Sequence, residues 1–117
     1  MQREVPVVLF VFNRTKQLEE TLKCLKGNSI KKLFVFADGS RNAEDVAGVM
    51  EVRAMIDSIK WVEVVKHYSN RNKGLSESIQ SGLDEVFKHH DTAIIIEDDV
   101  CVAPNFYSYI CHINQLY

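Results

Sequence analysis

The chain lacks any long hydrophobic run. Its longest apolar stretch among 117 residues extends from Val5 to Phe12 and includes Pro6. A membrane-spanning helix needs roughly 20 predominantly apolar residues. We therefore predict that the chain has no transmembrane segment.

The chain also lacks a strong charge of either sign. It has 14 Lys and Arg against 16 Asp and Glu, a formal net charge of −2. Proteins that bind nucleic acid or an anionic membrane surface usually carry a clear excess of positive charge. We expect no nucleic-acid partner, and any phosphate binding must depend on a local arrangement of charges.

Cysteine and histidine patterns typical of metal sites are missing too. The three cysteines, Cys24, Cys101 and Cys111, form no CxxC pair, and the four histidines form no HxxxH pair. These spacings exclude the common zinc patterns. The odd cysteine count favours reduced, inert thiols and hence a cytoplasmic protein. A position at the periphery of the inner membrane stays open.

What the chain does contain is a regular alternation of apolar runs and amphipathic stretches. With 46% apolar and 26% charged residues and no repeat or linker, it reads as one globular domain over residues 1–117. Strict strand and helix alternation predicts an α/β fold, a doubly wound, mostly parallel sheet of the Rossmann-like kind with helices on both faces. The predicted strands are Val5–Phe12, Leu33–Ala37, Trp61–Val65 and Thr92–Ile96.

Several local signals place the helices and loops between these strands. We predict Thr15 as the cap of the first helix and Asn42 as the cap of the second. The buried stripe of the second helix is predicted to begin at Val46. The polar segment Lys66–Gly74 is predicted to be a loop.

The run Ala93–Asp99 (AIIIEDD) is the most informative part of the chain, because four apolar residues end in three consecutive acids. Adjacent carboxylates repel each other, and burial beside apolar neighbours raises their pKa values unless a cation or hydrogen-bond donors offset it. Mg²⁺ and Mn²⁺ prefer oxygen ligands, and Mg²⁺ usually takes one or two protein carboxylates with substrate phosphates. The run predicts a metal and phosphate site at the end of a buried strand.

Polar residues follow each of the four predicted strands. In doubly wound sheets, ligands bind outside the carboxyl ends of the strands, where the strand order reverses. Asp38 in Asp-Gly-Ser also fits a simple turn, and Arg71 with Lys73 also fits an ordinary solvated loop. The four polar clusters are Asn13 with Arg14, Asp38–Ser40, His67–Lys73 and Glu97–Asp99.

These segments resemble the nucleotide-sugar-binding half of a GT-A fold glycosyltransferase. They are similar to family 2 glycosyltransferases and, in detail, to the N-acetylglucosaminyltransferase I type. The resemblance covers nearly the whole chain in the expected order, and the last segment is the most specific. The matching segments are Pro6–Arg14 (PVVLFVFNR), Phe36–Ser40 (FADGS), Asn72–Leu83 (NKGLSESIQSGL) and Glu97–Ile110 (EDDVCVAPNFYSYI).

The resemblance implies that the chain binds a nucleotide-diphospho-sugar, most naturally a UDP-sugar, with Mn²⁺ or Mg²⁺. Asp99 would hold the metal, and Glu97 and Asp98 would contact the ribose or the sugar. Asp38 would accept a hydrogen bond from the base. The other implied nucleotide-binding residues are Phe12 near the base, Asn13 and Arg14 beside the nucleotide and its phosphates, and Arg71 and Asn72 in the same pocket.

The resemblance also implies an enzyme, a hexosyl or N-acetylhexosaminyl transferase of carbohydrate biosynthesis with a carbohydrate or glycolipid acceptor. A complete enzyme of this type continues through an acceptor-binding half that supplies the general base, whereas this chain ends at Tyr117. We therefore expect a truncated donor-binding domain, inactive in transfer by itself. Ala37 precedes Asp38 where many family 2 members have another acid, so the base preference stays open.

Two other functions remain open. A noncatalytic nucleotide-binding module would share the pocket without turnover. A receiver-like, Mg²⁺-binding signalling domain has a similar size and topology. It would carry paired acids after the first strand, where this chain has Asn13 and Arg14.

Overall fold

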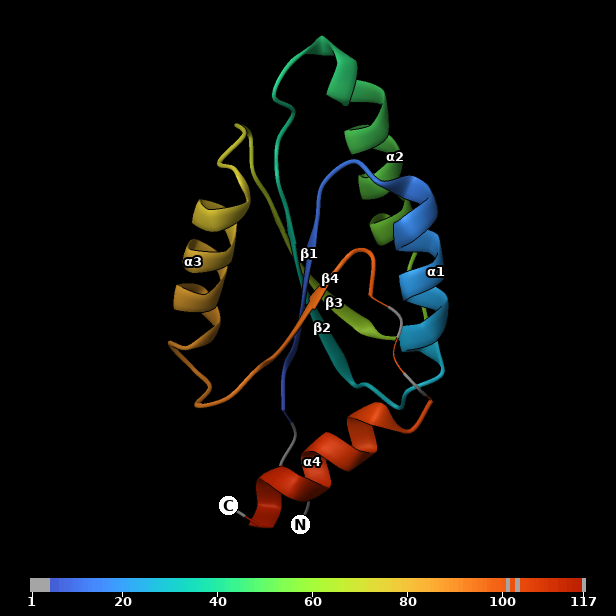
Figure 1. Ribbon diagram of the computed structural model, residues 1–117, viewed down its shortest axis with the longest axis vertical. Coiled ribbons are helices and arrows are strands. Elements are labelled where there is room, and N and C mark those ends of the chain that lie inside the picture. The colour runs from blue at the N-terminus through green and yellow to red at the C-terminus, as the bar shows by residue number, and fades with distance from the viewer. Residues whose placement is uncertain (1–4, 101, 103, 117) are drawn as a thin grey trace.

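The structure, a computed structural model, describes residues 5–100, 102 and 104–116, in which strands and helices alternate (Figure 1). The strands are β1 (Val7–Val11), β2 (Lys32–Ala37), β3 (Glu63–Tyr68) and β4 (Ile94–Glu97). The helices are α1 (Thr15–Lys26), the short 3₁₀ helix η1 (Ala43–Asp45), α2 (Val46–Asp57), α3 (Leu75–Val86) and α4 (Phe106–Leu116).

The four strands form one parallel sheet in the order β3-β2-β1-β4. The chain moves outward from β1 to β3 and then returns to add β4 on the other side of β1. This confirms the predicted α/β class and parallel sheet. It also places the reversal of strand order between β1 and β4.

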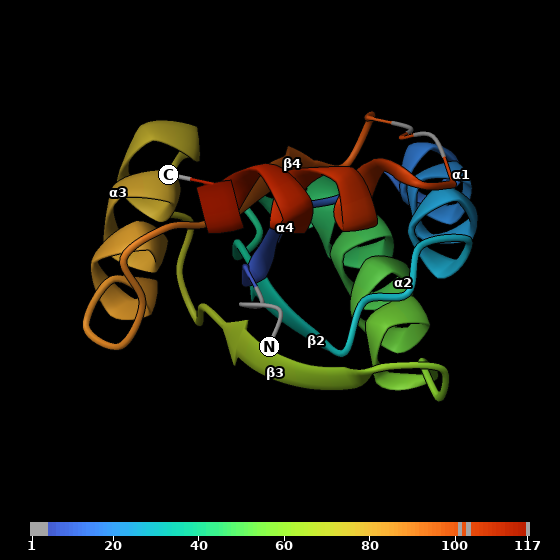
Figure 2. The ribbon, with the colours of Figure 1, turned by 90° about the horizontal axis from the view of Figure 1, so that it is seen from below.

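Helices cover both faces of the sheet (Figures 1 and 2). Helices α1 and α2 lie on one face and α3 on the other, while α4 lies beyond the end at which β1 begins. Strand β1 is buried throughout, because its side chains alternate between the two faces of the sheet and helices cover both faces. Val7, Leu9 and Val11 join the larger core, and Val8 and Phe10 pack in a smaller core with Val86 of α3.

The third strand lies further along the chain than the prediction Trp61–Val65. Pairing with β2 continues until Ala37 meets Tyr68, so the predicted loop residues Lys66 and His67 belong to β3. Asp57 stabilises this exposed end of the strand, because it accepts hydrogen bonds from Lys66 Nζ at 2.9 Å and Tyr68 Oη at 2.8 Å. Backbone pairing here outweighs the polar character of the segment.

Two of the predicted helix signals differ from the structure and one agrees. Thr15 is the first residue of α1 and Arg14 is its cap, with no side-chain capping hydrogen bond. Asn42 is a cap as predicted, but of η1, which leads into α2: its side chain accepts from the Glu44 backbone N–H at 3.0 Å, and α2 itself follows Asp45 with no side-chain capping hydrogen bond. Val46 is 44% exposed, because the buried stripe of α2 begins at Val49.

The expectation of three reduced thiols is wrong for Cys24, which is disulfide-bonded. Cys111 is free and buried, and Cys101 lies outside the described residues. Disulfides are typical of oxidising compartments, so the cysteines no longer support a cytoplasmic location. Among the residues that the structure describes, no helix has the length and apolar character needed to cross a membrane.

Candidate functional site

A cavity of about 310 Å³ lies at the carboxyl edge of the sheet, where β1 and β4 are neighbours. This is the position at which doubly wound sheets bind ligands, and the volume is at the lower end of the range for ligand pockets, about 300–1,000 Å³. Seven of the nine predicted site residues line it, namely Phe12, Arg14, Asp38, Asn72, Glu97, Asp98 and Asp99.

The floor of the cavity is aromatic. Phe10 pairs in register with Phe36 on β2 and with Glu97 on β4. The Phe10 and Phe36 rings stack with their centroids 5.5 Å apart, and Phe36 stacks on His67 of β3 at 4.6 Å. Phe10 is buried and Phe36 already stacks on both neighbouring rings, so the floor offers a ligand an apolar surface. This row of residues paired across the sheet therefore combines an apolar surface with the carboxylate of Glu97 on β4.

The acidic rim, defined as Glu97, Asp98 and Asp99, forms the other side of the cavity. Asp98 is buried, whereas Glu97 and Asp99 are exposed. Burial raises the pKa of Asp98; Arg14 opposes this shift, and the neighbouring charges of Asp99 and Glu97 add to it. The electrostatic environment of the rim therefore favours a bound cation.

Two contacts hold the rim beside α1. The Thr21 hydroxyl, itself buried, donates to the Asp98 carbonyl at 2.8 Å. Arg14 Nη1 lies 3.6 Å from Asp99 Oδ2, and both side chains are about half exposed. This ion pair places a guanidinium next to the predicted metal ligand.

The donor set of the rim fits a divalent cation that completes its coordination with ligand phosphates. Over residues 5–100, 102 and 104–116, no three His, Cys, Asp or Glu side chains gather into a metal-binding group. Mg²⁺ does not need such a group, because one or two carboxylates suffice when phosphates are present. Asp99, with Asp98 beside it, would provide the carboxylates.

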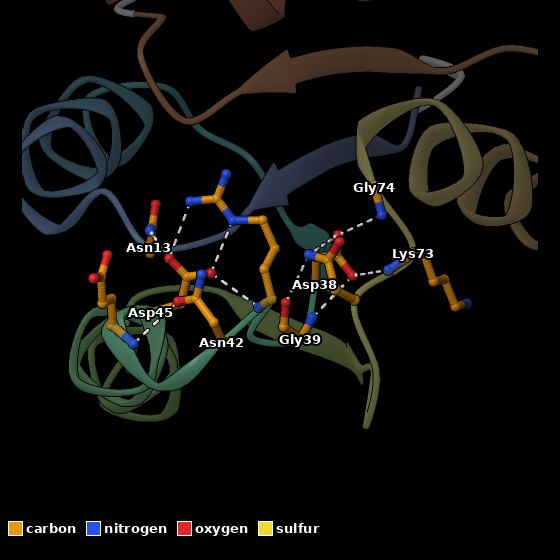
Figure 3. Close-up of polar contacts among 10 residues, drawn as sticks. Asn13, Asp38, Gly39, Asn42, Asp45, Lys73 and Gly74 are labelled. Atoms are coloured by element: carbon orange, nitrogen blue, oxygen red, sulfur yellow. Dashed lines mark hydrogen bonds and ion pairs between the residues drawn. The ribbon is translucent and has the colours of Figure 1, made fainter.

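Asp38 lines the same cavity, but four donors from its own chain surround its carboxylate (Figure 3). Oδ1 accepts from the Gly39 and Lys73 backbone N–H groups at 2.9 and 2.8 Å. Oδ2 accepts from Asn72 Nδ2 at 3.1 Å and from the Gly74 N–H at 3.0 Å. A carboxylate offers about four acceptor positions, so Asp38 is saturated and ties the loop before α3 to β2. Its predicted contact with the base stays a prediction.

Two glycines shape this loop, and Gly39 lets it approach the end of β2 closely. A Cβ on Gly39 would lie 2.6 Å from the carbonyl carbon of Arg71, so no larger residue fits there. Gly74 has a φ of 82°, a conformation that glycine adopts without strain. Arg53 Nη2 also donates to the Asp38 and Ser69 carbonyls at 3.3 and 2.7 Å. Asp38 and Arg53 therefore both hold this loop in place.

Asn13 and Arg71 are predicted site residues that do not line the cavity. Asn13 Nδ2 donates to Asp45 Oδ1 at 3.1 Å (Figure 3). Arg71 forms an exposed ion pair with Glu77, with Nη2 and Oε1 2.8 Å apart. Position after a strand places a residue at the correct edge, but the direction of its side chain depends on local backbone geometry.

Arg41 is a cavity-lining residue that the sequence interpretation missed. It follows the Asp-Gly-Ser turn directly, and its positive charge at that position is the only signal that could have identified it. Its Cζ lies 5.3 Å from the centroid of the Phe12 ring. Its backbone and side-chain hydrogen bonds lower the pKa of Asp45 to about 2. The cavity is therefore lined by a second guanidinium, in addition to that of Arg14.

No protein-family model matches the chain, and no curated protein matches it either.

Proposed function

We propose that the cavity binds the nucleotide diphosphate of a sugar donor together with Mn²⁺ or Mg²⁺, as the donor-binding part of a glycosyltransferase. The observation that carries this proposal is the convergence of three kinds of group in one cavity. They are the acidic rim, the guanidinium groups of Arg14 and Arg41, and the aromatic floor of Phe10 and Phe36.

Each part of such a donor has a chemically suitable counterpart in the cavity. The guanidinium groups can bind phosphate oxygens through paired hydrogen bonds. A metal at Asp99 would neutralise the remaining phosphate charge, and the aromatic floor with Phe12 suits a base. Glu97 and Asp98 are acceptors for the hydroxyl groups of a ribose or sugar.

The proposed role of this chain in transfer is to bind and orient the donor. When bound, a divalent cation supplies Lewis-acid stabilisation of the leaving diphosphate. We propose a hexosyl or N-acetylhexosaminyl transfer to a carbohydrate or glycolipid, with the general base provided by an acceptor-binding region. UDP is the proposed nucleotide because of the sequence resemblance.

Isothermal titration calorimetry tests the proposal directly. UDP, GDP and their sugar conjugates are titrated into the protein with and without Mn²⁺. We expect saturable binding of at least one nucleotide that strengthens when Mn²⁺ is added. Absence of metal-dependent nucleotide binding contradicts the proposal.

A nucleotide-binding module without turnover is the second candidate. The four internal donors on Asp38 favour this candidate, because they occupy that carboxylate. The other carboxylates that line the cavity, among the described residues, are those of the acidic rim, which the proposal assigns to the metal and the sugar. Release of free UDP from a UDP-sugar, measured with and without candidate acceptors, distinguishes an enzyme from a binding module. Labelling by acetyl phosphate would instead support the receiver-like alternative.

A further inference from the structure

The Arg41 guanidinium is held in place by a chain of contacts that begins at Asn13. Asp45, which is 4% exposed, accepts from Arg41 Nε at 2.9 Å and from Nη2 at 3.1 Å. It also accepts from the Arg41 backbone N–H at 2.9 Å and from Asn13 Nδ2 at 3.1 Å. Asp45 therefore orients Arg41, and Asn13 orients Asp45.

The remaining surface of the guanidinium is available to a ligand. One edge is used by Asp45, and one face lies over the Phe12 ring at 5.3 Å. Among the described residues, Nη1 has no hydrogen-bond partner, and the side chain is 61% exposed while lining the cavity. Arginine presents five N–H donors in a rigid fork, so the edge that includes Nη1 can still bind an oxyanion.

We infer that Arg41 is a pyrophosphate-binding residue of this cavity, and that Asn13 and Asp45 are positioning residues that act through it. The inference deepens the proposed function and rests on it for the nucleotide. It changes the role of Asn13, which the sequence resemblance implies to contact the nucleotide itself. It also separates two cationic groups, since Arg14 is paired with the exposed Asp99 and Arg41 with the buried Asp45.

The test compares the binding of inorganic pyrophosphate alone and of UDP with Mn²⁺ by calorimetry in five proteins and a matched control. These are the wild type, Arg41→Met, Arg41→Lys, Asn13→Ala and the double variant of Asn13→Ala with Arg41→Met. Lys60→Met is the matched control, because Lys60 is exposed and precedes β3 at the opposite edge of the sheet. Thermal unfolding of each variant confirms that it is folded.

Hydrogen bonds to charged groups contribute about 1.5–3 kcal/mol, which corresponds to about a ten- to hundredfold change in affinity. We expect a loss of that size in Arg41→Met, a smaller loss in Arg41→Lys and no change in Lys60→Met. Asn13→Ala should weaken binding a few-fold, and it should cause no further loss once Arg41 is methionine. Such non-additivity indicates that Asn13 acts through Arg41.

The other outcomes separate this inference from the proposed function. If the wild type binds pyrophosphate through Arg41 but not UDP, the inference stands and the proposed function fails. If UDP binds with Mn²⁺ and either Arg41 variant binds as tightly as the wild type, the inference fails and the proposed function stands. Equal losses from Asn13→Ala with and without Arg41 overturn the positioning role. Binding of neither probe overturns both.

Discussion

Asp38 and the acidic rim are two groups of carboxylates in one cavity with opposite surroundings. Asp38 is surrounded by four donors from its own chain. Among the described residues, the three neighbouring acids of the rim have one ion pair, from Arg14 to Asp99. Two carboxylates that line the same cavity can therefore differ in function, one structural and one ligand-binding. A saturated carboxylate stabilises the fold, whereas carboxylates without enough donors favour a cation.

The largest expected effect comes from removing the saturated carboxylate. Asp38→Ala leaves the N–H groups of Gly39, which is buried, and of Lys73 and Gly74, which are partly buried, without their acceptor. Each unsatisfied group costs about 1–3 kcal/mol, so we expect the free energy of unfolding to fall by about 3 kcal/mol or more. Urea denaturation measures this change, with Asp84→Ala on the exposed surface of α3 as the control. Unchanged stability with lost nucleotide binding would make Asp38 a ligand-binding group instead.

The next effect concerns the rim and should appear in binding, not in stability. Asp99→Asn removes the predicted metal ligand while keeping its volume, and the side chain is 48% exposed. We expect UDP affinity in the presence of Mn²⁺ to fall by about tenfold or more, equivalent to about 1.4 kcal/mol. The melting temperature without ligand should stay the same. Equal Kd values for the variant and the wild type would refute the metal assignment.

A smaller effect, of opposite sign to that of Asp38, is expected at Asp98. Its pKa is raised in the folded protein, so its ionised form destabilises the fold above that pKa. The destabilisation begins to decrease as the pH falls through the folded pKa, where the folded carboxyl becomes protonated, and it is gone below the lower pKa of the unfolded chain. Asp98→Asn should therefore raise the melting temperature at neutral pH and lose this advantage in acid. Calorimetric scans across a pH series measure the difference, and a lower melting temperature at neutral pH contradicts it.

The smallest effect is expected at Arg71, a predicted site residue whose side chain is exposed and paired with Glu77. Exposed ion pairs contribute little to stability, and Arg71 does not line the cavity. Arg71→Met should leave both the melting temperature and UDP affinity within experimental error. A clear loss of affinity would show that the loop rearranges to bring Arg71 to the ligand.

The fold was predictable because its signals are local. Strand β1 is apolar on both faces, which a strand buried between two helical layers requires. The alternation of strands and helices then leads to a parallel sheet, and the acids after β4 mark its carboxyl edge. The extent of β3 was less predictable, since residues such as His67 are held in the strand by pairing with β2.

The sequence by itself determined the fold class and the edge of the sheet at which polar groups collect, because both follow from the hydrophobic pattern. Only the tertiary structure decided which of those groups face the cavity. Asn13 turns toward Asp45, Arg71 pairs with Glu77, and Arg41 points to the cavity beside Phe12. Arg71 pairs six residues along the chain, and the local geometry of its loop decides that direction. The directions of Asn13 and Arg41 instead depend on contacts with segments about 30 residues away, which no local pattern encodes. For the same reason, the local Asp-Gly-Ser pattern indicates only a simple turn, whereas in the structure Asp38 is enclosed by a loop that begins more than 30 residues later.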